Sequence, residues 1–172
     1  MRIFKPLFTI LALGLIIYGI YQLLIIPMLF SGAKLVSMID PDTLLVRENG
    51  KYFFVQLIGA DAPERTGSNK SPQCYDGESI KQAADMFRTN RQINLTIDGK
   101  AGEKDSSGRN LRYVYLPDGT SYNGLLIKNG LAKESNPNNA DYKLKDEFQK
   151  DQEEAKSKGI GIWDSNGCNG SL

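Results

Sequence analysis

A chain of 172 residues is long enough for one domain with a substantial hydrophobic core. It contains no histidine, which excludes histidine-based catalytic triads, histidine-liganded zinc and imidazole general bases. Two of the 21 basic residues precede residue 34, and the other 19 stand against 20 acidic residues, so the rest of the chain has a net charge near −1 and is not a protein that coats nucleic acid.

The chain opens on an apolar segment with no charged residue from 6 to 33. About 20 apolar residues suffice for a helix that spans a bilayer, and Arg2 and Lys5 before them favour a cytoplasmic N-terminus. We therefore predict a single-pass membrane anchor at residues 1–33 and an exported domain at residues 34–172. The alternative is a signal peptide cleaved after Ala33, which would give a secreted protein.

Three strands are expected next, over residues 34–39, from residue 44, and over residues 52–58. Asn49 and Gly50 form a two-residue hairpin signal between the second strand and the third. The nearly continuous apolar character of the third strand suggests that both of its faces are buried.

The remainder alternates loops, strands and helices. Apolar periodicity and turn residues predict a loop at 59–77, a helix at 78–90, a strand at 92–97, a loop at 98–110, a strand at 111–116, and helices at 122–128 and 140–158. Asp76 and Asn139 are the expected caps of the first and last helices. Short strands without regular strand–helix alternation predict a mixed α+β fold, a small antiparallel barrel with helices packed outside.

Two acidic motifs flank the expected hairpin. Asp40-Pro41-Asp42-Thr43 precedes the second strand, and Asp61-Ala62-Pro63-Glu64 follows the third. Because a tight hairpin joins these strands, Asp42 and Asp61 should fall at the same end of the sheet, where two carboxylates could hold a hard cation such as Ca²⁺. Each motif taken alone also suits an ordinary solvated turn.

Two further residues suit phosphodiester chemistry. Glu64 could handle an attacking water. Arg109 follows Gly108 in a loop, and its planar guanidinium could bind two phosphate oxygens at once. A solvated loop arginine is the alternative interpretation.

Cys74 and Cys168 are the two cysteines of the chain. In an oxidising compartment, the simplest prediction is a disulfide between them. Two unpaired thiols are the alternative.

Five segments, in order, are similar to segments of the thermonuclease family, the calcium-dependent nucleases typified by staphylococcal nuclease. They are Val36-Ser37-Met38-Ile39-Asp40-Pro41-Asp42-Thr43, Val55-Gln56-Leu57-Ile58-Gly59-Ala60-Asp61-Ala62-Pro63-Glu64, Gly108-Arg109-Asn110-Leu111-Arg112-Tyr113-Val114-Tyr115, Asn129-Gly130-Leu131-Ala132 and Gly161-Ile162-Trp163. The resemblance covers residues 35–163 and implies an OB-type five-stranded antiparallel barrel with about three packed helices.

The resemblance also implies a site. Asp42, Asp61 and the backbone carbonyl of Ala62 would hold Ca²⁺, and Glu64 would activate water for attack on phosphorus. Arg109 would stabilise the developing charge. The resemblance further implies that Asp40 and Thr43 would support the metal loop. The implied reaction cleaves DNA and RNA and leaves 3′ phosphates.

Several positions depart from the family pattern. Gln56 stands where the family usually has a second arginine, so one phosphate clamp is lost, and Pro41 replaces the usual glycine of the metal turn. Ser106 and Ser107 replace residues near the nucleotide phosphate, and the stretch 134–136 lacks the family's base-contacting tyrosines.

The sequence therefore predicts a membrane-anchored or secreted, monomeric Ca²⁺-dependent nuclease acting outside the cytoplasm on DNA, RNA or both. The alternative, favoured by Gln56, is an OB-type nucleic-acid-binding or structural module that has lost efficient catalysis.

Overall fold

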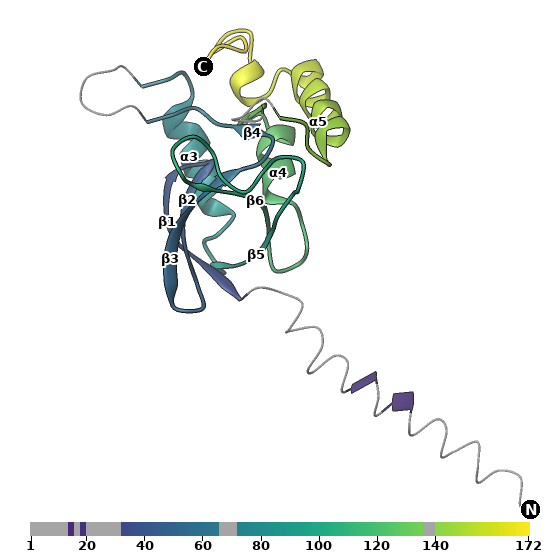
Figure 1. Cartoon of the computed structure of the whole chain (residues 1–172). Helices are drawn as coiled ribbons and strands as arrows, with labels where there is room; N and C mark the ends of the chain where they lie inside the picture. Colours follow the sequence, from purple (N-terminus) through teal and green to yellow (C-terminus); the bar gives the residue numbers. More distant parts are fainter. Residues whose placement is uncertain (1–13, 16–17, 20–31, 66–71, 136–139) are drawn as a thin grey trace, which may run out of the picture. The chain divides into compact units, whose positions relative to one another are not determined.

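The computed structural model describes residues 14–15, 18–19, 32–65, 72–135 and 140–172 (Figure 1). The chain divides into two units, residues 1–32 and 33–172. Within the described ranges, no helix combines the length and the apolar composition needed to cross a membrane. Most of the predicted anchor, residues 1–33, lies outside the described ranges. The anchor and the possible cleavage after Ala33 therefore stay predictions.

The second unit is built on a closed five-stranded barrel. Its strands, in the order in which they pair around the barrel, are β1 (Ala33–Asp40), β2 (Thr43–Glu48), β3 (Lys51–Leu57), β6 (Asn110–Tyr115) and β5 (Gln92–Thr96). The interior is filled by fully buried apolar side chains such as Leu44, Val46, Val55, Leu57 and Leu111. The expected barrel of five short strands is therefore present.

The expectation that all strands pair antiparallel is wrong at one position. β3 and β6 pair in parallel, with Val55 opposite Asn110 and Leu57 opposite Arg112. A parallel pair requires a long crossover connection. The 52 residues between these strands supply it, since they contain helix α3 (Asp76–Asp85) and strand β5. The barrel is consequently mixed.

The β2–β3 hairpin is confirmed. Asn49 and Gly50 both have positive φ, 49° and 78°, as a tight hairpin turn requires. The register runs from Glu48 opposite Lys51 to Thr43 opposite Gln56. The turn thus fixes which side chains of the two strands meet at the far end of the hairpin.

The prediction that β3 is buried on both faces is wrong for its first half. Tyr52 and Phe54 are 61% and 46% exposed, whereas Val55, Gln56 and Leu57 are buried. Antiparallel strands commonly have one solvated face. Only the end of β3 that reaches the β1–β2 turn is covered on both sides.

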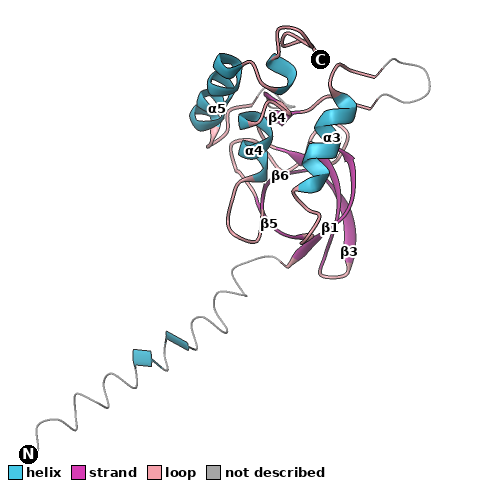
Figure 2. Ribbon diagram, turned by 180° about the vertical axis from the view of Figure 1, so that it is seen from behind, coloured by secondary structure: helices cyan, strands magenta, loops and turns pink. Residues whose placement is uncertain are grey.

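Three helices accompany the barrel (Figure 2): α3, α4 (Tyr122–Lys128) and α5 (Lys145–Lys158). α4 has its predicted bounds, and its start is capped by the Ser121 hydroxyl, which accepts from the amide of Gly124 at 3.1 Å. α3 begins and ends earlier than predicted. It starts after Tyr75, which has φ 71° and no side-chain cap, so Asp76 is its first residue rather than its cap.

α5 begins later than the predicted residue 140. The amides of Lys143 and Leu144 donate to Asp98 and to the hydroxyl of Tyr113 instead of to carbonyls one turn earlier. The expected cap, Asn139, lies outside the described residues. After α5, the short 3-10 helix η2 (Gly161–Trp163) returns Ile162 to the interior.

Two very short strands were not predicted from the sequence. β4 (Ala60–Asp61) pairs antiparallel with β7 (Lys133–Glu134), which sets Asp61 opposite Lys133. Two residues are too few to show alternation. This ladder joins the segment after β3 to the segment after α4.

Candidate functional site

The centre of the site is Asp42, in the tight turn between β1 and β2. Its carboxyl is buried, with 5% of the residue exposed. One oxygen accepts from the Thr43 hydroxyl at 3.2 Å and the other from the amide of Ala62 at 3.1 Å. The second contact joins the two acidic motifs, as the hairpin argument predicts.

The pKa is raised at both candidate metal carboxyls. Burial raises the pKa of Asp42 to about 6, and the negative charge of Asp61 adds to the rise, while hydrogen bonds from Ala62, Gln56 and Thr43 oppose it. Asp61 is exposed as a residue, but partial desolvation of its carboxyl raises its pKa, the charge of Glu64 adds to the rise, and Lys133 opposes it. A cation bound between these carboxyls would therefore favour their ionised forms.

Glu64 lies at the edge of the site with an exposed side chain. Its backbone is held by Gln73: the amide of Glu64 donates to the Gln73 side-chain oxygen at 2.7 Å, and the amide of Gln73 donates back at 3.4 Å. Gln73 comes from the loop before α3, and no sequence signal pointed to it.

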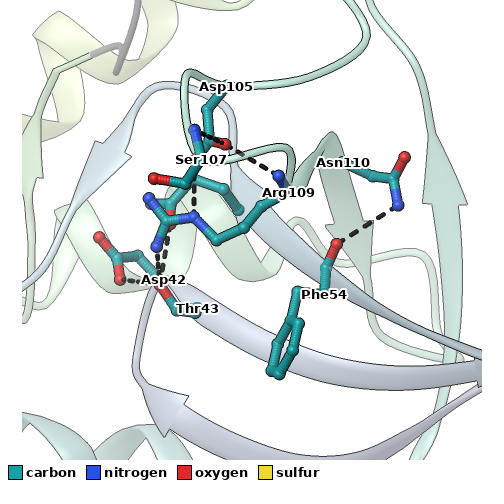
Figure 3. Close-up of polar contacts among 8 residues, drawn as sticks. Asp42, Thr43, Phe54, Asp105, Ser107, Arg109 and Asn110 are labelled. Atoms are coloured by element: carbon teal, nitrogen blue, oxygen red, sulfur yellow. Dashed lines mark hydrogen bonds and ion pairs between the residues drawn. The ribbon is translucent and has the colours of Figure 1, made fainter.

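Arg109 reaches the site from the loop before β6 (Figure 3). Its Nη1 donates to the Thr43 hydroxyl at 3.0 Å, and its Nε donates to Asp105 at 2.6 Å. The guanidinium therefore lies beside the Asp42 turn, where a phosphate bound to a metal at Asp42 could be contacted.

Asp105 is a site residue that the sequence reasoning missed. Its Oδ1 accepts from the amides of Ser107 and Arg109, both at 2.9 Å, and its Oδ2 faces the guanidinium. Burial opposes its ionisation, but these contacts with Arg109 and Ser107 outweigh it and lower its pKa. An aspartate whose side chain accepts the amide two residues later is common in turns. The sequence signal for such a turn is Asp105 followed by Gly108, whose φ is 81°.

Gln56 occupies the position of the missing arginine, with 4% exposed. Its side-chain oxygen accepts from the Thr43 hydroxyl at 2.8 Å. Thr43 thus lies between Gln56, Asp42 and Arg109. Its single hydroxyl proton can serve one acceptor at a time, and Gln56 is nearer than Asp42.

Asp40 and Pro41 tie the turn to its surroundings. Asp40 accepts from the amide of Arg65 at 3.0 Å, and the carbonyl of Pro41 accepts from the buried Tyr122 hydroxyl at 2.8 Å. Leu57 at the end of β3 donates its amide to the carbonyl of Asp42 at 2.9 Å. The turn is therefore held on three sides despite the proline.

The region that departs most from the family pattern is less fully described. Ser106 and Ser107 are exposed, and Glu134 accepts from the Tyr142 hydroxyl. Asn136 falls outside the described residues. Among the described residues, no group of three or more acidic, cysteine or histidine side chains is placed to hold a metal ion.

The structure joins Cys74 and Cys168 by a disulfide with a Cα–Cα distance of 5.7 Å. The bond ties the residue after Gln73 to the C-terminal segment, 94 positions later in the sequence. It therefore holds the loop that fixes the backbone of Glu64.

Comparisons with known proteins agree on one family. The model of the staphylococcal nuclease homologue family matches residues 54–165. The chain is 35% identical over 129 residues to the SPbeta prophage-derived endonuclease YokF of Bacillus subtilis (strain 168), an alignment that covers 75% of this chain and 43% of the relative. It is 35% identical over 129 residues to the endonuclease YncB of the same organism, which covers 60% of that relative.

A third relative is covered more fully. The chain is 34% identical over 135 residues to the thermonuclease of Staphylococcus hyicus, covering 76% of this chain and 74% of the relative. In contrast, it spans only about half the length of the two Bacillus subtilis relatives.

Proposed function

Since this chain belongs to the staphylococcal nuclease homologue family, we propose that it is a metal-dependent nuclease that hydrolyses phosphodiester bonds of DNA and RNA. One observation carries the proposal: the amide of Ala62 and the guanidinium of Arg109 both meet the Asp42–Thr43 turn. Residues from three separate segments therefore lie together, in the combination that phosphoryl transfer needs.

In this proposal, Asp42, Asp61 and the backbone carbonyl of Ala62 hold Ca²⁺. The donor set fits the ion, because hard cations prefer oxygen ligands. The pKa of each carboxyl is raised by desolvation and by a nearby carboxylate, Asp61 for Asp42 and Glu64 for Asp61, so a bound cation would favour the ionised form of both. When bound, the ion would neutralise charge on the scissile phosphate. Asp40 and Thr43 keep the turn in place through the contacts described above.

The protein's own residues would supply the rest of the chemistry. The exposed carboxylate of Glu64 orients a water and accepts its proton as the water attacks phosphorus. Arg109 has five N–H donors, of which the contacts with Asp105 and Thr43 use two, so a phosphate would be bound by the others. Cleavage of the bond from phosphorus to the 5′ oxygen would leave a 3′ phosphate.

The test is a nuclease assay on the full chain with single-stranded DNA. We expect hydrolysis with Ca²⁺, loss of hydrolysis with a chelator and recovery on adding Ca²⁺ back. Glu64→Ala should lower kcat by about 100-fold or more, because general-base catalysis typically contributes that much. Glu153→Ala, an exposed acidic residue of α5, is the matched control. Hydrolysis that persists with chelator, or that Glu64→Ala leaves unchanged, would contradict the mechanism.

Gln56 favours a second candidate, a nucleic-acid-binding module with weak catalysis. A neutral amide in a buried position cannot replace the charge of a guanidinium. Gln56→Arg should then raise kcat by about 100-fold, the usual effect of one electrostatic donor. Gln56→Asn, which adds no charge, is the control. If Gln56→Arg leaves kcat unchanged, the missing clamp does not limit the rate.

The location proposed for the enzyme is outside the cytoplasm, anchored by residues 1–33 or secreted after cleavage behind Ala33. The Cys74–Cys168 disulfide supports an oxidising compartment. In intact cells, an external protease should digest the domain, and thiol labelling under non-reducing conditions should leave both cysteines unlabelled. Labelling of both cysteines, or full protection from protease, would contradict this location.

A further inference from the structure

Two exposed aromatic rings line the outer face of β3. Tyr52 is 61% exposed and Phe54 is 46% exposed. Side chains alternate along a strand, so Tyr52, Phe54 and Gln56 lie on one face, about 6.8 Å apart from one to the next. Gln56 contacts Thr43 in the candidate site. The two rings therefore lie on the same face of β3 as Gln56, farther from the candidate site.

The neighbouring strand extends the same face. In the antiparallel ladder, Thr43 lies opposite Gln56, Leu45 opposite Phe54 and Arg47 opposite Tyr52. Residues directly opposite each other share a face. The guanidinium of Arg47 lies 5.9 Å from the centre of the Tyr52 ring. We call Arg47, Tyr52 and Phe54 the stacking face.

Two cationic side chains lie at the outer end of this face. Arg47 is exposed, and the register of β1 with β2 sets exposed Lys34 opposite it. Next to Phe54, the side-chain amide of Asn110 donates to the Phe54 carbonyl at 3.4 Å, one residue along from Arg109 (Figure 3). Two exposed rings and two exposed cations thus lie on one face, whose Thr43 end contacts the guanidinium of Arg109.

We propose that the stacking face binds single-stranded nucleic acid, with bases stacked on Phe54 and Tyr52 and a phosphate near Arg47. The inference rests on the proposed function, which specifies a nucleic acid at the site. Exposed rings beside a basic side chain are the elements of sequence-tolerant single-strand binding. A duplex keeps its base faces stacked inside, so this face should favour single strands over duplexes.

The test measures binding without cleavage. Fluorescence anisotropy with a labelled oligothymidine of about 10 nucleotides, within the range of OB-fold site sizes, is recorded on the full chain in chelator. Tyr52→Ala and Phe54→Ala should each weaken binding about 5- to 100-fold, the effect of removing one base–ring stack. Tyr52→Phe should bind as the parent does. Ile97→Ala, another exposed apolar residue at 60%, lies beyond the end of β5 and is the matched control.

Several outcomes would overturn the inference. They are unchanged affinity in both ring variants, an equal loss in Ile97→Ala, or equal affinity of the parent for duplex and single strand. Self-association that both ring variants abolish, without an effect on DNA binding, would instead assign the face to a second copy of the chain. If Phe54→Ala lowers Tm, Tyr52→Ala decides, because its ring is the more exposed.

The same variants separate this inference from the proposed function. If hydrolysis is absent in the parent but binding still depends on the rings, the proposed nuclease fails and the stacking face stands. If hydrolysis is present and Tyr52→Ala leaves KM for a long single strand unchanged, the stacking face fails and the nuclease stands.

Discussion

Arg109, the residue proposed to bind phosphate, is itself held by two protein groups. Asp105 accepts its Nε–H at 2.6 Å and Thr43 accepts from Nη1 at 3.0 Å. Asp105 is buried, whereas a third of the Arg109 side chain is exposed. We infer that the aspartate orients a guanidinium whose other N–H groups are available to a phosphate, while the negative charge of Asp105 partly offsets its positive charge.

The first prediction concerns Asp105→Asn. The Asn side-chain oxygen can still accept the amides of Ser107 and Arg109, but its NH₂ group would face the Nε–H of Arg109. We expect the loop to stay folded while kcat falls by about 10-fold, because the guanidinium is no longer oriented. Steady-state kinetics with single-stranded DNA, together with Tm, measures both effects.

The same substitution in an Arg109→Ala variant tests whether Asp105 acts through Arg109. In an Arg109→Ala chain, adding Asp105→Asn should lower kcat little further, because residues that act as a unit are not additive. A full second loss of kcat in that background would show that Asp105 acts by another route.

At the scale of elements, Asp98 links three parts of the fold. Its Oδ1 accepts from the amide of Lys100 at 3.0 Å, and its Oδ2 accepts from the Tyr113 hydroxyl of β6 and from the amide of Lys143 before α5, both at 2.7 Å. Burial opposes ionisation of this carboxyl, but the hydrogen bonds from Lys143, Lys100 and Tyr113 outweigh it and lower its pKa.

The prediction for Asp98 is a pH-dependent loss of stability. Because its folded pKa lies below the ordinary value of 3.8, its stabilisation is complete above about pH 4 and is lost as pH falls through the folded pKa. Asp98→Asn should lower the free energy of unfolding by about 2 kcal/mol at neutral pH, as hydrogen bonds to a charged acceptor do. Urea unfolding of both proteins measures the difference.

The difference between the parent and Asp98→Asn should shrink below about pH 4. Asp118→Asn is a suitable control, since Asp118 also has a lowered pKa from its hydrogen bonds with Thr120 but lies in an exposed turn. A gap that is the same at neutral and acid pH would show that the charge of Asp98 is not what stabilises the fold.

Local signals predicted the elements that local chemistry determines. Asn49-Gly50 specified a hairpin, and the hairpin specified that Asp42 would meet the segment after β3. The parallel β3–β6 pair depends instead on how a 52-residue connection returns the chain, which periodicity does not encode. The start of α5 likewise depends on Asp98, 45 positions earlier than Lys143.

In the candidate site, too, some contacts could be predicted from the sequence and others could not. The hairpin predicted that Asp42 and Asp61 fall at the same end of the sheet, and the amide of Ala62, next to Asp61, donates to Asp42. No apolar periodicity points to Asp105 or Gln73, and the turn signal of Asp105 does not reveal that it contacts Arg109. Asp105 accepts from the guanidinium of Arg109, and Gln73 accepts from the amide of Glu64. Sequence reasoning therefore proposed groups suited to chemistry but did not find the residues that hold two of them in place.

At the scale of the whole molecule, the Cys74–Cys168 disulfide closes a loop of 94 residues within the unit 33–172. In the chain-entropy description, a loop of 94 residues stabilises the fold by about 4–5 kcal/mol, because the unfolded chain loses freedom. A domain of this size has a total stability of only about 5–15 kcal/mol. The disulfide is thus comparable with the whole margin between folded and unfolded protein.

We therefore predict that the Cys74→Ser, Cys168→Ser double variant loses about 4 kcal/mol in urea unfolding. The parent protein in a thiol reductant should unfold at the urea concentration of the double variant, because both lack the same bond. Glu64 depends on Gln73, which precedes Cys74, so kcat should fall in the double variant under conditions where it is still folded. A parent protein whose unfolding is insensitive to reductant would contradict the role given to this bond.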